Sequence, residues 1–169
     1  VVDPENGVDI MPVGQPGELR IKGPQMITGY WNRPEETASL IQGEWLYTGD
    51  IGHYDEDGRL TIVDRKKDMI IVGGYNVFPR EVDEVLFAHP GVQEAAAVGV
   101  PDSHRGEAIQ AYVVLAEGAA PSEKEIIDYC REKLAKFKVP SIVQIVPSLP
   151  KTPAAKIDKM ALRKIAAKN

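Results

Sequence analysis

The chain has 169 residues, 43% of them hydrophobic, and a net charge of −5. These values predict one ordinary globular domain or two small ones, and the negative charge argues against a nucleic-acid partner. No apolar run approaches the roughly 18–20 residues of a membrane span. The single cysteine, Cys130, excludes an internal disulfide and suits a reducing cytoplasm.

The first 65 residues have the pattern of strands joined by turns. The segment GELRIKG, residues 17–23, alternates apolar and polar side chains, as a half-buried strand does. EWLYTGD, residues 44–50, predicts a short strand that enters a Thr-Gly-Asp turn, and DEDG, residues 55–58, predicts a hairpin. Twelve acidic and four basic side chains precede Arg65. This acidic segment does not have the pattern of a complete domain.

From about residue 66 onward, strands alternate with helices. Pro79 suits the first position of a short helix, and strands are predicted at 92–100 and 108–116. Ser122 and Glu125 predict a capping box at the start of a further helix, and a last strand is predicted at 141–146. A final helix begins at Asp158, with Leu162 and Ile165 facing inward. The prediction is an α+β unit in which helices flank a mixed sheet with a preceding β-hairpin.

Asp50 and the basic triplet from Arg65 to Lys67 carry chemistry suited to a nucleotide. A carboxylate has two acceptor oxygens and can bind both hydroxyls of a ribose, although an aspartate after a glycine can also simply close a turn. Arginine and lysine side chains can meet phosphates, or they can solvate a turn. Each signal is weak when taken alone.

Two further features point to a ligand. Gly73 and Gly74 lack a Cβ, so they would allow something to approach the backbone closely, although a bulge would use them equally well. The proline-rich segment at 147–157 predicts an extended loop that presents Lys151 and Lys156. A lysine on such a loop is suited to neutralising a phosphate or carboxylate.

These features, in this order, resemble the adenylate-forming superfamily of acyl-CoA synthetases, luciferases and peptide-synthetase adenylation domains. The resemblance covers nearly the whole chain. Its segments are GELRIKGPQMITGYWNRPEETA (17–38), YTGD (47–50), DRKKDMIIVGGYNVFPREVD (64–83) and LPKTPAAKI (149–157). The region from Val63 to Val92 is most similar to long-chain fatty acyl-CoA synthetases.

The resemblance implies a role for each candidate residue. Nucleotide binding would fall to Tyr47, Thr48, Asp50 and Arg65, the hinge to Lys67, the CoA channel to Gly73 and Gly74, and catalysis to Lys156. The catalytic lysine would stabilise charge between the substrate carboxylate and the α-phosphate. The family usually has glycine just before that lysine, where this chain has Ala155. Alanine narrows the conformational options of the loop.

The resemblance also implies the organisation of a longer enzyme. Residues 1–65 would be the C-terminal end of a large adenylate-binding domain, and residues 66–169 a small C-terminal lid domain, with the hinge near 66–67. The whole enzyme would be a cytoplasmic long-chain fatty acid–CoA ligase that uses ATP and CoA, forming an acyl-adenylate and AMP. Its Mg²⁺ ligands, phosphate loop and acyl pocket would lie in the missing N-terminal domain, so this piece alone is expected to be inactive.

Alternatives remain at this stage. The acid can be an aryl or medium-chain acid, and a different class of protein, a stand-alone non-catalytic binding or regulatory module with the lid fold, fits the same motifs. Oligomeric state and peripheral membrane contact stay open. The histidines lack metal-ligand spacing and are expected at the surface, namely His53, His89 and His104. Four aromatic residues can stack on adenine, but packing is the expected role of most of them: Tyr30, Trp31, Trp45 and Tyr47.

Overall fold

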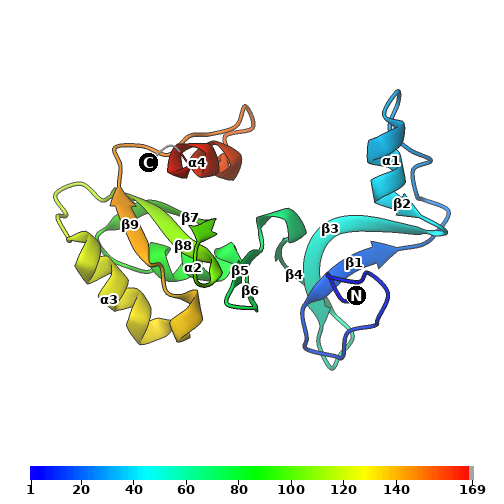
Figure 1. Ribbon diagram of the computed structural model, residues 1–169, viewed down its shortest axis with the longest axis horizontal. Helices are drawn as coiled ribbons and strands as arrows, with labels where there is room; N and C mark the ends of the chain where they lie inside the picture. Colours follow the sequence, from blue (N-terminus) through cyan, green and yellow to red (C-terminus); the bar gives the residue numbers. More distant parts are fainter. Residues whose placement is uncertain (168–169) are drawn as a thin grey trace. The chain divides into compact units, whose positions relative to one another are not determined.

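The computed structural model describes residues 1–167. The chain divides into two compact units, the first from Val1 to Lys67 and the second from Asp68 onward. Figure 1 shows the strands of the first unit in blue and cyan and the sheet and helices of the second in green to red. Within the described residues, no helix is both long enough and apolar enough to cross a membrane.

The first unit is built around an antiparallel four-stranded sheet. Its strands are β1 (Gly17–Ile21), β2 (Ile41–Gln42), β3 (Trp45–Tyr54) and β4 (Leu60–Arg65). Strand β3 pairs with all three of the others. Because β3 is shared, it is the strand that joins the sheet together, and most of its residues pair with a neighbouring strand.

The predicted Thr-Gly-Asp turn is wrong, because the segment lies inside β3, which continues to Tyr54. Pairing with β1 and with β4 on the two sides keeps the chain extended. Gly49 has a φ of 70°, and the register with β4 shifts between Ile51 and Gly52. The irregular backbone is therefore absorbed within a distorted long strand instead of reversing the chain.

A short helix, α1 (Pro34–Leu40), was not predicted from the sequence. It buries no residue and has no side-chain cap, so it lacks the apolar stripe that normally reveals a helix. The available signals were Pro34 at the first helical turn and the acidic side chains of Glu35 and Glu36, which favour a helix N-terminus.

The second unit has a mixed five-stranded sheet. Its strands are β5 (Ile70–Val72), β6 (Tyr75–Val77), β7 (Val92–Asp102), β8 (Gly106–Leu115) and β9 (Ile142–Ile145). The order is β6-β5-β8-β7, and β9 pairs with β8 in parallel while the other pairs are antiparallel. The predicted mixed sheet with a preceding hairpin is confirmed.

Helices cover both faces of this sheet (Figure 1). The helices are α2 (Pro79–Phe87), α3 (Glu123–Lys133) and α4 (Lys159–Ala166), with single 3-10 turns η1 (Lys66–Asp68) and η2 (Lys136–Lys138). On one face, α2 and α3 pack on alternate residues such as Ala95 and Ala97. On the other face, Leu162 of α4 packs on Ala96, Val98 and Tyr112. Because successive side chains of a strand point to opposite faces of the sheet, alternate residues of β7 belong to two different cores.

The local helix signals are confirmed with one exception. Ser122 and Glu125 make the capping box of α3, and Asp158 accepts a hydrogen bond from the Ala161 amide at the start of α4. Leu162 is 1% exposed, as predicted, but Ile165 is 43% exposed and does not face inward. At 3.6 residues per turn the inward position after Leu162 is four residues later, and Ala166 occupies it.

Candidate functional site

The candidate residues fall in both units, and each set has its own geometry. In the first unit, Asp50 lies on β3 directly opposite Arg65 on β4. The Arg65 Nε is 2.8 Å from Asp50 Oδ1, and the two side chains are 58% and 28% exposed. This pair occupies one carboxylate oxygen, and among residues 1–167 no side chain pairs with Oδ2, which can therefore accept from a ligand. A partly exposed carboxylate beside a guanidinium can accept from ribose hydroxyls while the arginine donates to an oxygen nearby.

Thr48 positions the backbone of Asp50. Its hydroxyl donates to the Leu19 carbonyl on β1 at 2.8 Å and accepts from the Asp50 amide at 3.1 Å. A Cβ on Gly49 would meet nothing within 4 Å, so the requirement for glycine there is its positive φ and not a lack of space. The tripeptide is therefore held by one hydrogen bond to β1 and by one within itself.

Tyr47 is held inside the first unit by its hydroxyl group. The hydroxyl donates to the Gly7 carbonyl at 2.8 Å and accepts from Arg20 at 3.4 Å. Tyr47 and Thr48 also line a cavity of about 500 Å³ together with Tyr30 and Lys66. The structure thus brings two of the predicted nucleotide residues, as well as a tyrosine expected to pack, to one concave surface.

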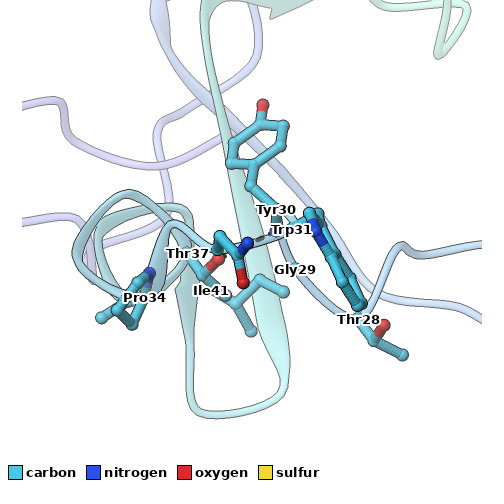
Figure 2. A pocket seen from close by; sticks show the side chains of 9 residues that line it. Thr28, Gly29, Tyr30, Trp31, Pro34, Thr37 and Ile41 are labelled. Atoms are coloured by element: carbon cyan, nitrogen blue, oxygen red, sulfur yellow. Dashed lines mark hydrogen bonds between the residues drawn. The ribbon is translucent and has the colours of Figure 1, made fainter.

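A second hollow in the first unit lies at the start of α1 (Figure 2). Its volume is about 690 Å³, and it is lined by residues 28–32 and by side chains of the α1 segment. The Tyr30 amide donates to Thr37 Oγ1 at 2.9 Å, and the rings of Tyr30 and Trp31 extend in different directions (Figure 2). Trp31 is 90% exposed, so the packing expected for it is not made within the described chain.

In the second unit, Gly73 and Gly74 form the two-residue turn between β5 and β6. Their φ angles are 58° and 83°, the combination that the tightest hairpin turns require and that glycine adopts without strain. The Gly73 amide donates to the Arg105 carbonyl at 2.8 Å. A Cβ on either glycine would point into open space. The bare backbone at this turn is accordingly accessible to a ligand.

Beside the glycine turn lies a groove of about 1010 Å³ that no sequence motif indicates. It combines Gly73 with basic and aromatic side chains that are distant in sequence, among them Tyr75, Arg105, Arg131, Lys136 and Phe137. The rings of Tyr75 and Phe137 stack with centroids 4.6 Å apart. No local motif links residues from three separate segments, so only the sheet pairing brings them together.

Lys156 lies at the end of a tight loop. The backbone closes between Thr152 and Lys156, where the Thr152 amide donates to the Lys156 carbonyl at 2.7 Å, and Lys151 bridges to Ile157 at its base. Within residues 1–167 the Lys156 ammonium makes no hydrogen bond or ion pair, whereas Lys151 pairs with Glu94 at 2.7 Å. Of the two lysines that the sequence placed on this loop, Lys156 is therefore the one available to an external anion.

Ala155 explains how this loop tolerates the missing glycine. Its φ is 57°, and its amide donates to the Thr152 carbonyl at 2.9 Å. A turn closed in this way and followed by a left-handed residue is a common three-residue hairpin loop, and glycine is the residue best suited to that last position. The loop thus keeps the glycine conformation and accepts the strain of an alanine.

Ala155→Gly is expected to stabilise the second unit. The substitution removes about 1–2 kcal/mol of strain from the left-handed backbone conformation. Glycine also makes the unfolded chain more flexible, which offsets about 0.4–1 kcal/mol of that gain. The expected gain in unfolding free energy is about 0.5–1 kcal/mol, measured by urea denaturation with circular dichroism. Ala154→Gly is the matched control, because the φ of Ala154 is not positive, and it should destabilise. A loss of stability in Ala155→Gly would show that the loop carries no such strain.

The remaining predicted residues are Lys67 and the histidines. Lys67 is exposed at the end of the first unit. His53 lies on β3 and is half-buried, and its buried Nδ1 has no hydrogen-bond partner among the described residues, so it is not the exposed surface residue that was expected. His89 accepts from the Gly91 amide. Among the described residues, no three His, Cys, Asp or Glu side chains gather as a metal site would require.

Comparison with known proteins gives consistent matches along the chain. Residues 81–156 match the family described as the AMP-binding enzyme C-terminal domain. A long-chain-fatty-acid–CoA ligase of Bacillus subtilis is 51% identical over 83% of this chain and 25% of its own length. A 2-succinylbenzoate–CoA ligase of Geobacillus kaustophilus is 47% identical over 90% of this chain and 31% of its own length.

Solved structures agree with these sequence matches. The crystal structure of ATP-bound MatB from Rhodopseudomonas palustris aligns with a TM-score of 0.89 and 40% identity, over 98% of this chain and 33% of that one. The chain therefore spans about a quarter to a third of the length of the proteins that it matches.

Proposed function

Because residues 81–156 carry the C-terminal domain of the AMP-binding enzymes, we propose that this chain acts as the C-terminal part of an ATP-dependent acid–thiol ligase. In the first half-reaction the carboxylate of the acid attacks the α-phosphorus of ATP, and acyl-adenylate and pyrophosphate form. In the second, the thiol of CoA attacks the acyl carbon, a thioester forms, and AMP leaves.

The nucleotide role is proposed for the residues of the first unit. Asp50 would bind the ribose hydroxyls through its free oxygen, with Arg65 donating beside it. Thr48 would hold the Asp50 backbone in place. Tyr47 would contribute to the wall of the adjoining cavity, since its hydroxyl is already committed to Gly7.

Lys156 is the proposed catalytic residue, and its free ammonium is the observation that carries the function. The reaction brings a carboxylate and a phosphate together, and both are negatively charged. A fixed cation between them stabilises the transition state more than the separated reactants. The loop supports this role, because hydrogen bonds at its base fix the backbone of Lys156 while its ammonium has no partner within residues 1–167.

The groove beside Gly73 and Gly74 is the proposed approach of CoA. Its arginine and lysine side chains suit the phosphates of that molecule. The bare glycine backbone would let a narrow chain pass close to the turn. The adenylate is already activated, so the thiol needs positioning more than it needs a strong base.

Lys67 is the proposed hinge, because the chain passes from one compact unit to the next there. Rotation about it would withdraw Lys156 after adenylation and bring the glycine turn to the adenylate for the second half-reaction. The described residues offer no cluster that fits the Mg²⁺ expected with ATP, so none of these steps is assigned to the metal. We place the ligase in the cytoplasm, with which a single buried cysteine is consistent.

A long-chain fatty acid is the proposed substrate, and the Bacillus relative supports it. An aryl acid is the second candidate, because the 2-succinylbenzoate ligase is nearly as similar. The acid pocket would lie in the remainder of the longer protein, so the two acids must be separated by experiment.

The test is acyl-CoA formation by the full-length protein with long-chain, medium-chain and aryl acids. We expect acid-dependent pyrophosphate release and thioester formation, with the highest kcat/KM for a long-chain acid. The 169-residue chain alone serves as the inactive control. If the folded full-length protein forms no acyl-CoA with any of these acids, the proposed function is wrong and a non-catalytic binding role replaces it.

A further inference from the structure

The connection between the two units is flanked by an ion pair on each side. The chain leaves the first unit at Lys67 and enters the second at Asp68. Residues 66–68 form a single 3-10 turn, η1. Such a short connection can act as a pivot only if its neighbours are held, because a change in backbone torsion otherwise spreads over several residues.

On the first side, Lys66 is tied to the first unit by Glu18. Its Nζ lies 2.7 Å from Glu18 Oε2, and the Glu18 side chain is only 5% exposed. Glu18 is itself fixed, since its backbone exchanges hydrogen bonds with Val2 at 2.7 and 2.8 Å and pairs with β3. A nearly buried carboxylate holds its counter-ion strongly, because water competes poorly for it.

On the second side, Asp68 is tied to the second unit by Arg163 of α4. The Arg163 Nη2 lies 2.9 Å from Asp68 Oδ1 and donates to the Asp68 carbonyl at 3.4 Å. The Asp68 side chain is 14% exposed. Helix α4 is anchored in turn by buried Leu162 and by the pair of Lys159 with Asp83. Both the side chain and the main chain of Asp68 are therefore held.

Lys67 alone lies between these two ion pairs. It is exposed, and within residues 1–167 its side chain makes no hydrogen bond or ion pair. We infer that Glu18 and Arg163 are positioning residues that confine any reorientation of the two units to the backbone torsions of Lys67. The inference rests on the proposed function for its role in the reaction, but the confinement itself is a property of this chain.

The first test measures the distance distribution between spin labels on the two units of the 169-residue chain by double electron–electron resonance. Labels go on exposed Glu56→Cys and Glu132→Cys. Cys130 is 0% exposed and burial raises its thiol pKa to about 11, so it does not compete for label. Arg163→Gln should roughly double the width of the distribution, because motion spreads to Asp68.

Matched variants separate positioning from simple charge loss. Lys164→Gln removes the neighbouring exposed charge on α4 and should leave the width unchanged, while Arg163→Lys keeps a cation and should restore it. Asp68→Asn removes the other partner of the same ion pair and should act like Arg163→Gln. If one of these two variants does not fold, the other still tests the inference. Equal widths in wild type, Arg163→Gln and Asp68→Asn would overturn the inference.

The second test uses the full-length ligase and separates the two half-reactions. Lys67→Pro restricts φ at the pivot and should abolish thioester formation from supplied acyl-adenylate while adenylation persists. Adding Arg163→Gln should restore at least part of the thioester step, because Asp68 is then free to rotate. No restoration would overturn the inference. If the wild-type full-length protein has no acyl-CoA activity, the proposed function is wrong. The spin-label distance distributions would then still test whether reorientation is confined to Lys67.

Discussion

Lys156→Ala in the full-length protein is expected, on the proposed function, to lower acyl-adenylate formation by about 100- to 1,000-fold, the usual effect of removing one preorganised charge-stabilising group. The alanine variant leaves two anions to meet without a cation between them. Thioester formation from supplied acyl-adenylate and CoA should be nearly unchanged, because that step no longer joins a carboxylate to a phosphate. Pyrophosphate exchange measures the first step, and single-turnover thioester formation measures the second.

Lys151→Ala is the matched control for this prediction. Lys151 lies on the same loop and has the same charge, but its ammonium is paired with Glu94 at 2.7 Å and is half-exposed. A partly exposed pair of this kind contributes less than about 1 kcal/mol, so adenylation should fall severalfold at most. If Lys156→Ala retains both half-reactions, Lys156 is only a surface lysine and its catalytic assignment is wrong.

Leu162→Ala is expected to lower the unfolding free energy of the second unit by about 2–5 kcal/mol, the usual cost of a leucine-to-alanine cavity. Leu162 is 1% exposed and packs with Tyr112 and Leu149 on the sheet face that α4 covers. Ion pairs from Lys159 and Arg163 hold α4 at both ends of this contact, so the helix cannot readily move to fill the cavity.

The measurement uses two signals in urea denaturation of the 169-residue chain. Both tryptophans, Trp31 and Trp45, lie in the first unit, so fluorescence reports that unit. Circular dichroism reports mainly the second, which holds three of the four α-helices found in residues 1–167. Leu162→Ala should lower the dichroism midpoint and leave the fluorescence midpoint in place.

Met160→Ala is the control on the same helix. Met160 is 58% exposed, and a substitution at such a surface position usually changes stability by no more than about 0.5 kcal/mol. Equal midpoints for Leu162→Ala and Met160→Ala would show that the α4 contact adds little to the second unit. A fall in both signals for Leu162→Ala would show instead that the two units unfold together.

Of the candidate site, the sequence predicted the residues but not their relations. The residue pattern placed Lys151 and Lys156 on one loop, and only the resemblance singled out Lys156. The structure separates the two lysines through Glu94, which lies 57 residues before Lys151 in the chain. The resemblance assigned Asp50 and Arg65 to the same nucleotide, and the β3–β4 register sets them opposite each other. These relations depend on strand pairing between distant segments, which no local pattern encodes.

The sequence by itself determined the features that act within one turn of chain. The capping box of Ser122 and Glu125, the helix start at Pro79 and the glycine turn at Gly73 all depend on torsion preferences and hydrogen bonds between near neighbours. The order of its motifs also pointed to the adenylate-forming superfamily, and the family match over residues 81–156 agrees with it. Such information is local, so it can be predicted from the sequence without knowledge of the fold.

Only the tertiary structure decided which distant residues contact those local features. It kept Thr48 and Asp50 inside a strand paired on both sides, and it turned Ile165 outward and Ala166 inward on α4. It also gave Lys66 and Asp68 partners in Glu18 and Arg163, which lie 48 and 95 residues away along the chain. Packing and sheet register make these choices, because each depends on which distant segment covers a side chain and removes it from water.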